Sequence, residues 1–273
     1  MRQAHEISGL LGRGILGRGI RDRDLEAEGL IVAEGRLLVE RLLALREPGL
    51  LGVYATEEAA ARFASLVADR CPLVALSEGE LSTMAGYPFH RGVFAVARRP
   101  PAKDAASLVE ELLAARMPPL LLLPETRDQE NLGSLVRSAA AFGLGAVLLG
   151  PTSADFLSRR VVRVSMGAAF DMPHVRLASP SDLAAFRLAG YSLTAAVLDD
   201  AAAVDAGNWS PRGPHILAFG AEYEGLGADW REACDEAVTI GMAPGPDSLN
   251  VAAAGAILMW RLCTAIARDG PLG

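Results

Sequence analysis

A cluster of polar residues follows the apolar run "PLLLLP" at 119–124. Asp128, Glu130, Asn131 and Arg137 lie at the start of the amphipathic stretch 127–143. A helix start needs one N-cap residue and an apolar stripe, so most of these polar groups are not required for folding. The excess indicates that this segment binds a ligand or takes part in chemistry.

Two later segments combine glycine with polar side chains. "HILAFGAEYEGLG" carries Gly220, Glu222 and Gly225 directly after an apolar run, and "TIGMAPGPDSLN" ends with Ser248 before a long helical pattern. Glycine allows a backbone to approach a ligand closely or to adopt positive φ. Taken singly, each segment has a structural alternative, which is a turn for the first and a helix N-cap for the second.

The elements around these segments predict how they are brought together. Short apolar runs at 120–123, 146–150, 192–198, 215–220 and 237–242 are each followed by a loop and a helical pattern. This alternation is typical of an α/β fold, a parallel sheet with helices on both faces. Because ligands bind at the carboxyl ends of such strands, the three polar segments are expected to meet there.

The N-terminal half predicts a separate, small α/β unit. Its pattern indicates helices at 33–46 and 57–70 and strands at 50–56, 72–77 and 92–99. Pairs of prolines near residues 100 and 119 frame a joining stretch. We therefore expect domains at 1–100 and 119–273, with a linker at 101–118. "GRGILG" at 12–17 fits a dinucleotide fingerprint in letters, but no strand precedes it, so we reject it as a nucleotide site.

Composition excludes several classes of protein. No apolar run approaches the roughly 20 residues of a membrane span, and the N-terminus has no continuous apolar region of a signal peptide. The three cysteines and four histidines are dispersed, without metal-ligand spacing. We therefore expect no membrane partner, no metal and a cytoplasmic location.

The net charge of −7 is unevenly distributed. Residues 1–100 contain 13 arginines and 13 acidic residues, so the excess of acid lies in the rest of the chain. Arginine suits phosphate recognition, although genome base composition could produce the same bias. The overall charge therefore does not exclude nucleic acid as a partner of the first half.

The three polar segments also resemble the motifs of a known family. "NLGSLVRSAAAFG", "ILAFGAEYEGLG" and "TIGMAPGPDSLNVAAAG" are similar, in order, to the three motifs of the SpoU/TrmH branch of SPOUT RNA 2′-O-ribose methyltransferases. Between them, "VVRVSMGAAF" (161–170) resembles that family's R-x-S-x-G-A segment. The resemblance covers roughly residues 119–268. It extends more weakly to "EGLIVAEGRLLVERLL" and "HRGVFAVARRP", which resemble a small RNA-recruiting domain with a ribosomal-protein fold.

This resemblance implies a trefoil-knotted C-terminal domain that binds S-adenosylmethionine and forms homodimers whose active site uses both subunits. It implies RNA as substrate, with rRNA favoured over tRNA. The implied cofactor-binding residues are Gly220, Glu222, Gly225, Leu226, Ile240, Met242, Leu249 and Asn250.

The resemblance also implies catalytic roles. Arg137 would stabilise the developing alkoxide of the ribose, and whether it also takes the proton is open. Asn131 would hold the arginine or the ribose, Ser248 and Asn250 would line the methyl-transfer site, and Arg163 would bind RNA phosphate.

The chain departs from the family pattern at Ala221, Tyr223 and Gly241. An alternative function is therefore an RNA-binding scaffold for ribosome assembly that has lost cofactor binding. The presence of the four predicted catalytic residues favours the enzyme.

Overall fold

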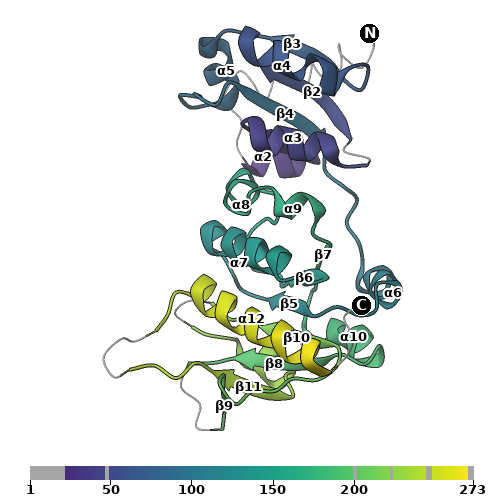
Figure 1. The fold of residues 1–273 in the computed structure, drawn as a ribbon, viewed down its shortest axis with the longest axis vertical. Helices are drawn as coiled ribbons and strands as arrows, with labels where there is room; N and C mark the ends of the chain where they lie inside the picture. The colour runs from purple at the N-terminus through teal and green to yellow at the C-terminus, as the bar shows by residue number, and fades with distance from the viewer. Residues whose placement is uncertain (1–21, 47–48, 199–201, 222–223, 244–247, 270–273) are drawn as a thin grey trace. The chain divides into compact units, whose positions relative to one another are not determined.

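The computed structural model describes residues 22–46, 49–198, 202–221, 224–243 and 248–269. The chain folds as two compact units, each visible in Figure 1. The first comprises residues through Pro101 together with Phe156–Asp171, and the second comprises Ala102–Asp155 and the chain from Met172 onward. The rejected "GRGILG" segment lies outside the described residues.

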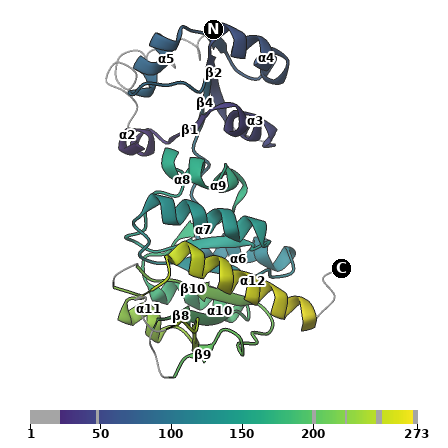
Figure 2. The ribbon, with the colours of Figure 1, turned by 60° about the vertical axis from the view of Figure 1, so that its left-hand side comes forward.

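The first unit is a mixed four-stranded sheet with helices on both faces. In the order β1-β4-β2-β3, β4 is antiparallel to β1 and β2, while β2 and β3 are parallel. Figure 2 shows α2 and α5 on one face and α3 and α4 on the other. The elements are α2 (Asp22–Ala27), β1 (Leu30–Glu34), α3 (Arg36–Ala44), β2 (Leu50–Ala55), α4 (Glu57–Val67), β3 (Leu73–Ala75), α5 (Glu78–Ala85), β4 (Val93–Arg98), α8 (Arg159–Val164) and α9 (Ala168–Asp171).

The second unit confirms the predicted parallel sheet. Its seven strands have the order β7-β6-β5-β10-β8-β11-β9, and all the strand pairs are parallel. The elements are α6 (Ala105–Ala114), β5 (Leu120–Leu123), α7 (Gln129–Ala141), β6 (Ala146–Leu149), β7 (His174–Arg176), η2 (Pro180–Leu183), α10 (Ala184–Leu188), β8 (Ser192–Ala196), β9 (Val204–Asp205), β10 (His215–Ala218), α11 (Ala228–Glu232), β11 (Glu236–Thr239) and α12 (Val251–Asp269).

Buried side chains attach helices to both faces of this sheet. Residues of α6, α10 and α11 form one core cluster with alternate residues of the strands. On the other face α12 packs against α7, and a Cβ atom built on Gly255 would lie 2.3 Å from Cδ2 of Leu135. A larger residue at 255 would therefore require the side chain of Leu135 to move. No helix in the described ranges is long and apolar enough to cross a membrane.

Several elements, including β1, α5, β7 and β9, depart from the sequence prediction. β1 takes Ala33 and Glu34, which were assigned to a helix, because Gly35 turns the chain at φ 89° before α3 starts. Helix α5 was missed, since it has few apolar residues, although Ser77 and Glu80 form a capping box at its start. Strands β7 and β9 have three and two residues, too few to show a period of two.

Candidate functional site

A cavity of about 960 Å³ opens at the carboxyl ends of the strands in the second unit. One side is formed by residues that follow β8, β10 and β11, and the other by the starts of α7 and α12. The volume lies in the range of small-molecule and cofactor sites. The cavity is therefore at the edge of the sheet where the sequence predicted a ligand.

Most of the predicted site residues of this unit line the cavity. They come from all three polar segments, and they are Asn131, Gly220, Gly225, Leu226, Ile240, Met242, Ser248, Leu249 and Asn250. Glu222 and Tyr223 lie outside the described residues. Arg137 and Arg163 are not among the residues that line this cavity.

The loop after β10 folds back tightly on itself. Ala221 and Gly225 form an antiparallel bridge, with N–H···O distances of 2.8 and 3.0 Å in the two directions. A Cβ atom built on Gly220 would lie 2.0 Å from the backbone of Gly225 and Leu226. Residue 220 must therefore be glycine for the loop to close over the end of the strand.

Glu125, two residues after the end of β5, fixes this loop and was not identified from the sequence. Its carboxylate accepts a hydrogen bond of 3.1 Å from the backbone N–H of Gly227. A signal was present, because Glu125 follows the run 120–123 by two residues, at the predicted ligand edge. Its neighbour Thr126 is buried, and the Thr126 hydroxyl has no hydrogen-bond partner among the described residues.

An amide pair connects the starts of α7 and α12. Nδ2 of Asn250 donates a hydrogen bond of 3.0 Å to Oδ1 of Asn131. Oδ1 of Asn250 accepts from the backbone N–H groups of Ala252 and Ala253, at 2.9 and 3.3 Å. Asn250 is thus oriented by its own helix while it holds Asn131 at the edge of the cavity.

The walls of the cavity combine apolar side chains with polar groups. Val197, Leu198, Ile240 and Leu258 supply apolar surface, and Thr239, Ser248 and the two asparagines supply uncharged polar groups. Glu224 and Arg231 contribute one charge of each sign. This lining suits a ligand that has a flat apolar part and several hydrogen-bonding groups.

Arg137 is exposed on α7, and within the described residues its guanidinium makes no hydrogen bond or ion pair. Asn131, which was predicted to hold Arg137 or the ribose, accepts a hydrogen bond from Asn250. The position of Arg137 leaves its donor groups available to a second molecule.

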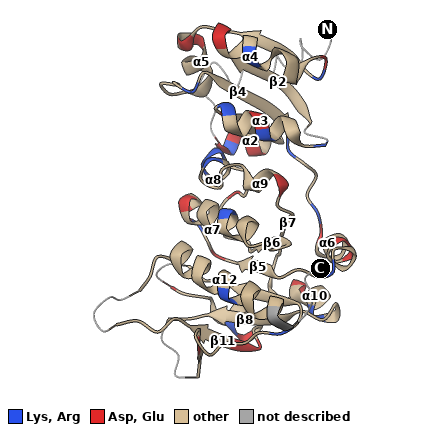
Figure 3. Cartoon of the chain, viewed as in Figure 1, with Lys and Arg blue, Asp and Glu red and all other residues tan. Residues whose placement is uncertain are grey.

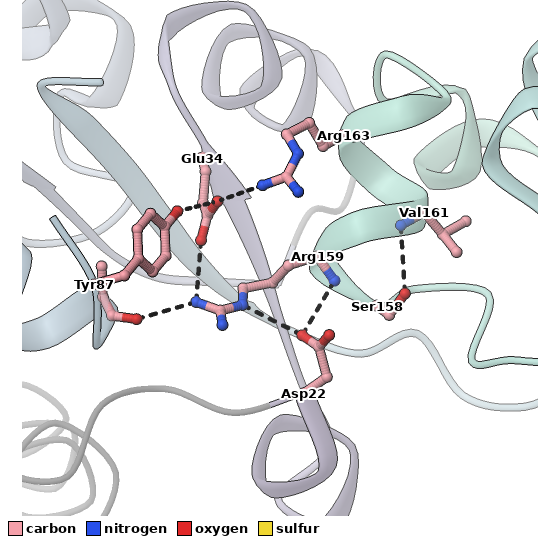
Figure 4. Close-up of polar contacts among 8 residues, drawn as sticks. Asp22, Glu34, Tyr87, Ser158, Arg159, Val161 and Arg163 are labelled. Atoms are coloured by element: carbon pink, nitrogen blue, oxygen red, sulfur yellow. Dashed lines mark hydrogen bonds and ion pairs between the residues drawn. The ribbon is translucent and has the colours of Figure 1, made fainter. Parts of the chain in front are cut away.

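Arg163 lies on α8 in the first unit, where Nη1 is 3.7 Å from Oε2 of Glu34 (Figure 4). Glu34 is also bound by Arg159 and by the hydroxyl of Tyr87, at 3.2 and 2.7 Å. This ion cluster was not predicted, because Glu34 and Arg159 are far apart in the sequence.

A buried polar network lies at the other ends of the strands. The Thr194 hydroxyl donates to Glu236 at 2.8 Å and is also hydrogen-bonded to Nε2 of His215. Burial lowers the pKa of His215, although the carboxylates of Glu236 and Asp235 oppose this shift. His215 begins β10 and Glu236 begins β11, so the network lies at the edge of the sheet opposite to the cavity.

The comparison with protein families agrees with this geometry. The family model described as the SpoU rRNA Methylase family matches residues 118–260. The chain belongs to this family. The family predicted from the three sequence motifs is confirmed.

Among the described residues, no group of three His, Cys, Asp or Glu side chains could hold a metal ion.

Relatives and solved structures extend the comparison beyond the matched domain. A protein of Mycobacterium bovis, named an uncharacterized tRNA/rRNA methyltransferase, is 35% identical over 85% of this chain and 80% of its own length. The 23S rRNA (guanosine-2′-O-)-methyltransferase RlmB of Acinetobacter baylyi is 28% identical over 68% of this chain and 76% of its own length.

The AdoMet-bound rRNA methyltransferase of Sinorhizobium meliloti has a TM-score of 0.76 at 22% identity, covering 99% of this chain and 95% of that one. The SpoU methyltransferase AviRb of Streptomyces viridochromogenes, solved with AdoMet, has a TM-score of 0.74 at 23% identity and covers 99% of this chain and 100% of that one. These two structures share the fold of both units.

Proposed function

We propose that this protein transfers a methyl group from S-adenosylmethionine to a ribose 2′-hydroxyl of RNA. The observation that carries the proposal is that one cavity is lined by residues of all three motif segments of an RNA methylase family. The similarity to relatives named as tRNA/rRNA and 23S rRNA 2′-O-methyltransferases supports RNA as the substrate class. We favour rRNA over tRNA.

The cavity fits S-adenosylmethionine in size and chemistry. The tight loop at Gly220 brings backbone groups of Gly225 and Leu226 to its edge, where they can bind polar parts of the cofactor. Apolar residues such as Ile240 and Leu249 suit the adenine ring. Glu222 remains a proposed cofactor residue of the same loop. The cofactor, when bound, supplies an electrophilic methyl group.

The residues at the mouth of the cavity position the ribose. We assign Asn131 to hydrogen bonding with the ribose, and Asn250 to holding Asn131 in place through their 3.0 Å contact. Ser248 is exposed at the edge of the cavity, where its hydroxyl can hydrogen-bond the substrate. Loss of the ribose 2′-hydroxyl proton is unfavourable in water, so the oxygen that develops negative charge needs a cationic donor beside it.

Arg137 is our candidate for that donor. Because it does not line the cavity of its own chain, we propose that it acts in a homodimer, at the active site of the partner subunit. Apolar side chains exposed on α12 support self-association: Ile257 and Trp260, one turn apart, are 42% and 56% exposed. The planar guanidinium would hold the developing alkoxide and a nearby phosphate together.

The remaining features follow from this function. We propose that residues 119–273 carry the knotted methyltransferase fold and that residues 1–100 recruit RNA. Of the predicted linker 101–118, Ala105–Ala114 folds as α6 in the core of the second unit, and Phe156–Asp171 packs with the first unit. Free cysteines at 71, 234 and 263 fit a reducing compartment, so we place the reaction in the cytoplasm.

Calorimetric titration with S-adenosylmethionine tests the proposal against the scaffold alternative. The enzyme is expected to bind the cofactor with measurable heat at micromolar to low millimolar concentration. A chain that gives no heat at millimolar cofactor, yet still binds RNA, is a scaffold.

A further inference from the structure

A second cavity, of about 280 Å³, lies entirely within the first unit. Three arginines line it, Arg36, Arg91 and Arg163, together with Glu34 and the start of α3. Figure 3 shows the basic residues of α8 in blue on this unit. This concentration of arginine around a small cavity raises the question of what anion it holds.

Glu34, the acidic residue that lines the cavity, is already bound from several sides. Its side chain is 4% exposed, and Oε1 accepts a hydrogen bond of 3.2 Å from Arg159. The Tyr87 hydroxyl donates to Oε2 at 2.7 Å, and burial together with this bond raises the pKa of Tyr87 to about 12. The charge of Glu34 is therefore already shared between Arg159 and Arg163, and both of its oxygens accept hydrogen bonds or form ion pairs.

Arg159 and Arg163 differ in how their donors are used (Figure 4). Arg159 also contacts Asp22 and the carbonyl oxygen of Ala85, so its guanidinium is held inside the cluster. Among the residues that the structure describes, Arg163 has only the contact with Glu34, whose 3.7 Å is longer than a hydrogen bond. Most N–H groups of Arg163 are therefore without a partner among the described residues.

Arg91 adds a second cation with unused donors. It is exposed, and no hydrogen bond or ion pair of its side chain exists within the described part of the chain. Its aliphatic stem approaches Gly35, since a Cβ atom built there would lie 3.5 Å from Cδ of Arg91. Arg36 is different, because it forms an ion pair of 2.7 Å with Glu40.

The start of α3 adds to the same positive potential. Gly35 provides no side-chain cap, and the first turn of this nine-residue helix has no acidic residue. The N–H groups at such a helix start carry partial positive charge and favour anions. The start of α3 and the arginines therefore act in the same direction.

We infer that this cavity binds a phosphate group of the RNA backbone, with Arg91 and Arg163 as its principal ligands. The inference deepens the proposed function and rests on it for the identity of the anion. Glu34 acts as a positioning residue, which holds Arg163 at the edge of the cavity without consuming its donors. The cavity thus assigns RNA recruitment to a specific point of the first unit.

Full-length protein and a fluorescein-labelled oligoribonucleotide of 20 uridines provide the test, with binding followed by anisotropy from 0.05 to 0.2 M KCl. For single-stranded RNA, each lost phosphate contact lowers the slope of log K against log salt by about 0.7. This corresponds to about fivefold weaker binding at 0.1 M salt. We expect that loss for Arg91→Gln, which breaks no contact among the described residues.

Leu37→Glu removes unfolding as an explanation. Leu37 lines the cavity and is 53% exposed, and an acidic residue in the first turn of α3 stabilises the helix. The inference therefore predicts a protein that is at least as stable but binds the oligonucleotide at least about fivefold more weakly. The matched control is Arg62→Gln on α4, an exposed arginine away from the cavity, which should change affinity less than about twofold.

The outcomes separate the two claims. If Arg91→Gln and Leu37→Glu both bind like the wild type, the phosphate site is wrong, whatever the protein does with S-adenosylmethionine. If they lose affinity as expected, while calorimetry of the wild type detects no cofactor binding, the phosphate site stands and the proposed enzymatic function fails.

Discussion

The cofactor cavity of the second unit and the arginine-lined cavity of the first unit are built from opposite kinds of residue. The cavity of the second unit is lined mainly by glycine backbone, apolar side chains and uncharged polar groups, whereas that of the first is lined by three arginines and the carboxylate of Glu34. The first kind recognises a ligand by shape and by fixed hydrogen bonds. The second recognises an anion by charge, which depends strongly on salt.

This difference predicts that affinity for S-adenosylmethionine and affinity for RNA can be lost independently of each other. Substitutions that alter loop geometry in the second unit should remove cofactor binding and leave RNA affinity unchanged. Substitutions of charge in the first unit should do the reverse. The following predictions test this separation, from the largest expected effect to the smallest.

Gly220→Ala should have the largest effect. The added methyl group would lie 2.0 Å from the backbone of the returning loop, so the loop cannot close on the end of β10. We expect S-adenosylmethionine affinity to fall more than about a hundredfold in calorimetry, with RNA affinity within twofold of the wild type. Gly79→Ala, where the new Cβ meets no atom closer than 4.0 Å, is the control. If Gly220→Ala binds S-adenosylmethionine like the wild type, the loop after β10 is not part of the cofactor site.

Arg137→Lys should lose at least about a hundredfold in methyl transfer. Lysine keeps the charge but cannot reproduce a planar, forked donor that contacts both the ribose oxygen and a phosphate. Single-turnover transfer with saturating RNA and cofactor is the measurement, and cofactor affinity and melting temperature should barely change. The control is Arg116→Lys, at another exposed arginine of the second unit, which should leave the rate of methyl transfer unchanged. A loss of less than tenfold would indicate that Arg137 is an ordinary surface residue without a role in methyl transfer.

Asn250→Ala should weaken transfer by about tenfold or more and cost roughly 1 kcal/mol of unfolding free energy, as expected for a lost helix cap. The substitution removes both the cap of α12 and the bond that holds Asn131.

Ser248→Ala should weaken transfer without the stability loss, because no hydrogen bond of its hydroxyl exists within the described residues. Asn208→Ala, exposed and outside the cavity, is the control. Wild-type turnover in both site variants would contradict the assignment.

The smallest effect concerns pH and His215. The pKa of His215 is lowered in the folded chain, so below its ordinary value near 6.5 the unfolded chain binds a proton that the folded chain does not. The contribution of His215 to the free energy of unfolding should therefore be complete above that pH. It should decrease as the pH falls further, by at most about 1.4 kcal/mol per pH unit. Urea unfolding of the wild type and of His215→Asn at pH 7.0 and 5.5 measures this contribution. Equal pH dependence in both proteins would show that His215 does not contribute.

The second unit was more predictable from the sequence than the first. The strands that the sequence predicted are short apolar runs, such as the fully buried Leu120–Leu123, so they were visible without knowledge of their neighbours, whereas the short β7 and β9 were missed. The polar residues that follow them could be assigned to one edge, because parallel strands share a direction. What the sequence could not show is that Arg137 does not line the cavity of its own chain, since this depends on how α7 packs.

In the first unit the informative contacts are long-range ion pairs. Glu34 resembled a residue of a helix, and nothing near it in the sequence indicates that Arg159 and Arg163 bind its carboxylate. Arg163 was predicted to bind phosphate from its motif, but Arg91 was not, because a lone arginine before a strand is an ordinary surface residue. Only the fold brings these residues to one cavity.

Transfer of a labelled methyl group tests the central claim most directly. The purified protein is incubated with methyl-labelled S-adenosylmethionine and unmodified ribosomal RNA transcripts, and the RNA is digested to nucleosides for mass spectrometry. The account predicts label in a 2′-O-methylated nucleoside, present with the wild type and absent with Gly220→Ala. Label on a base, or no label in RNA that the protein demonstrably binds, would contradict it.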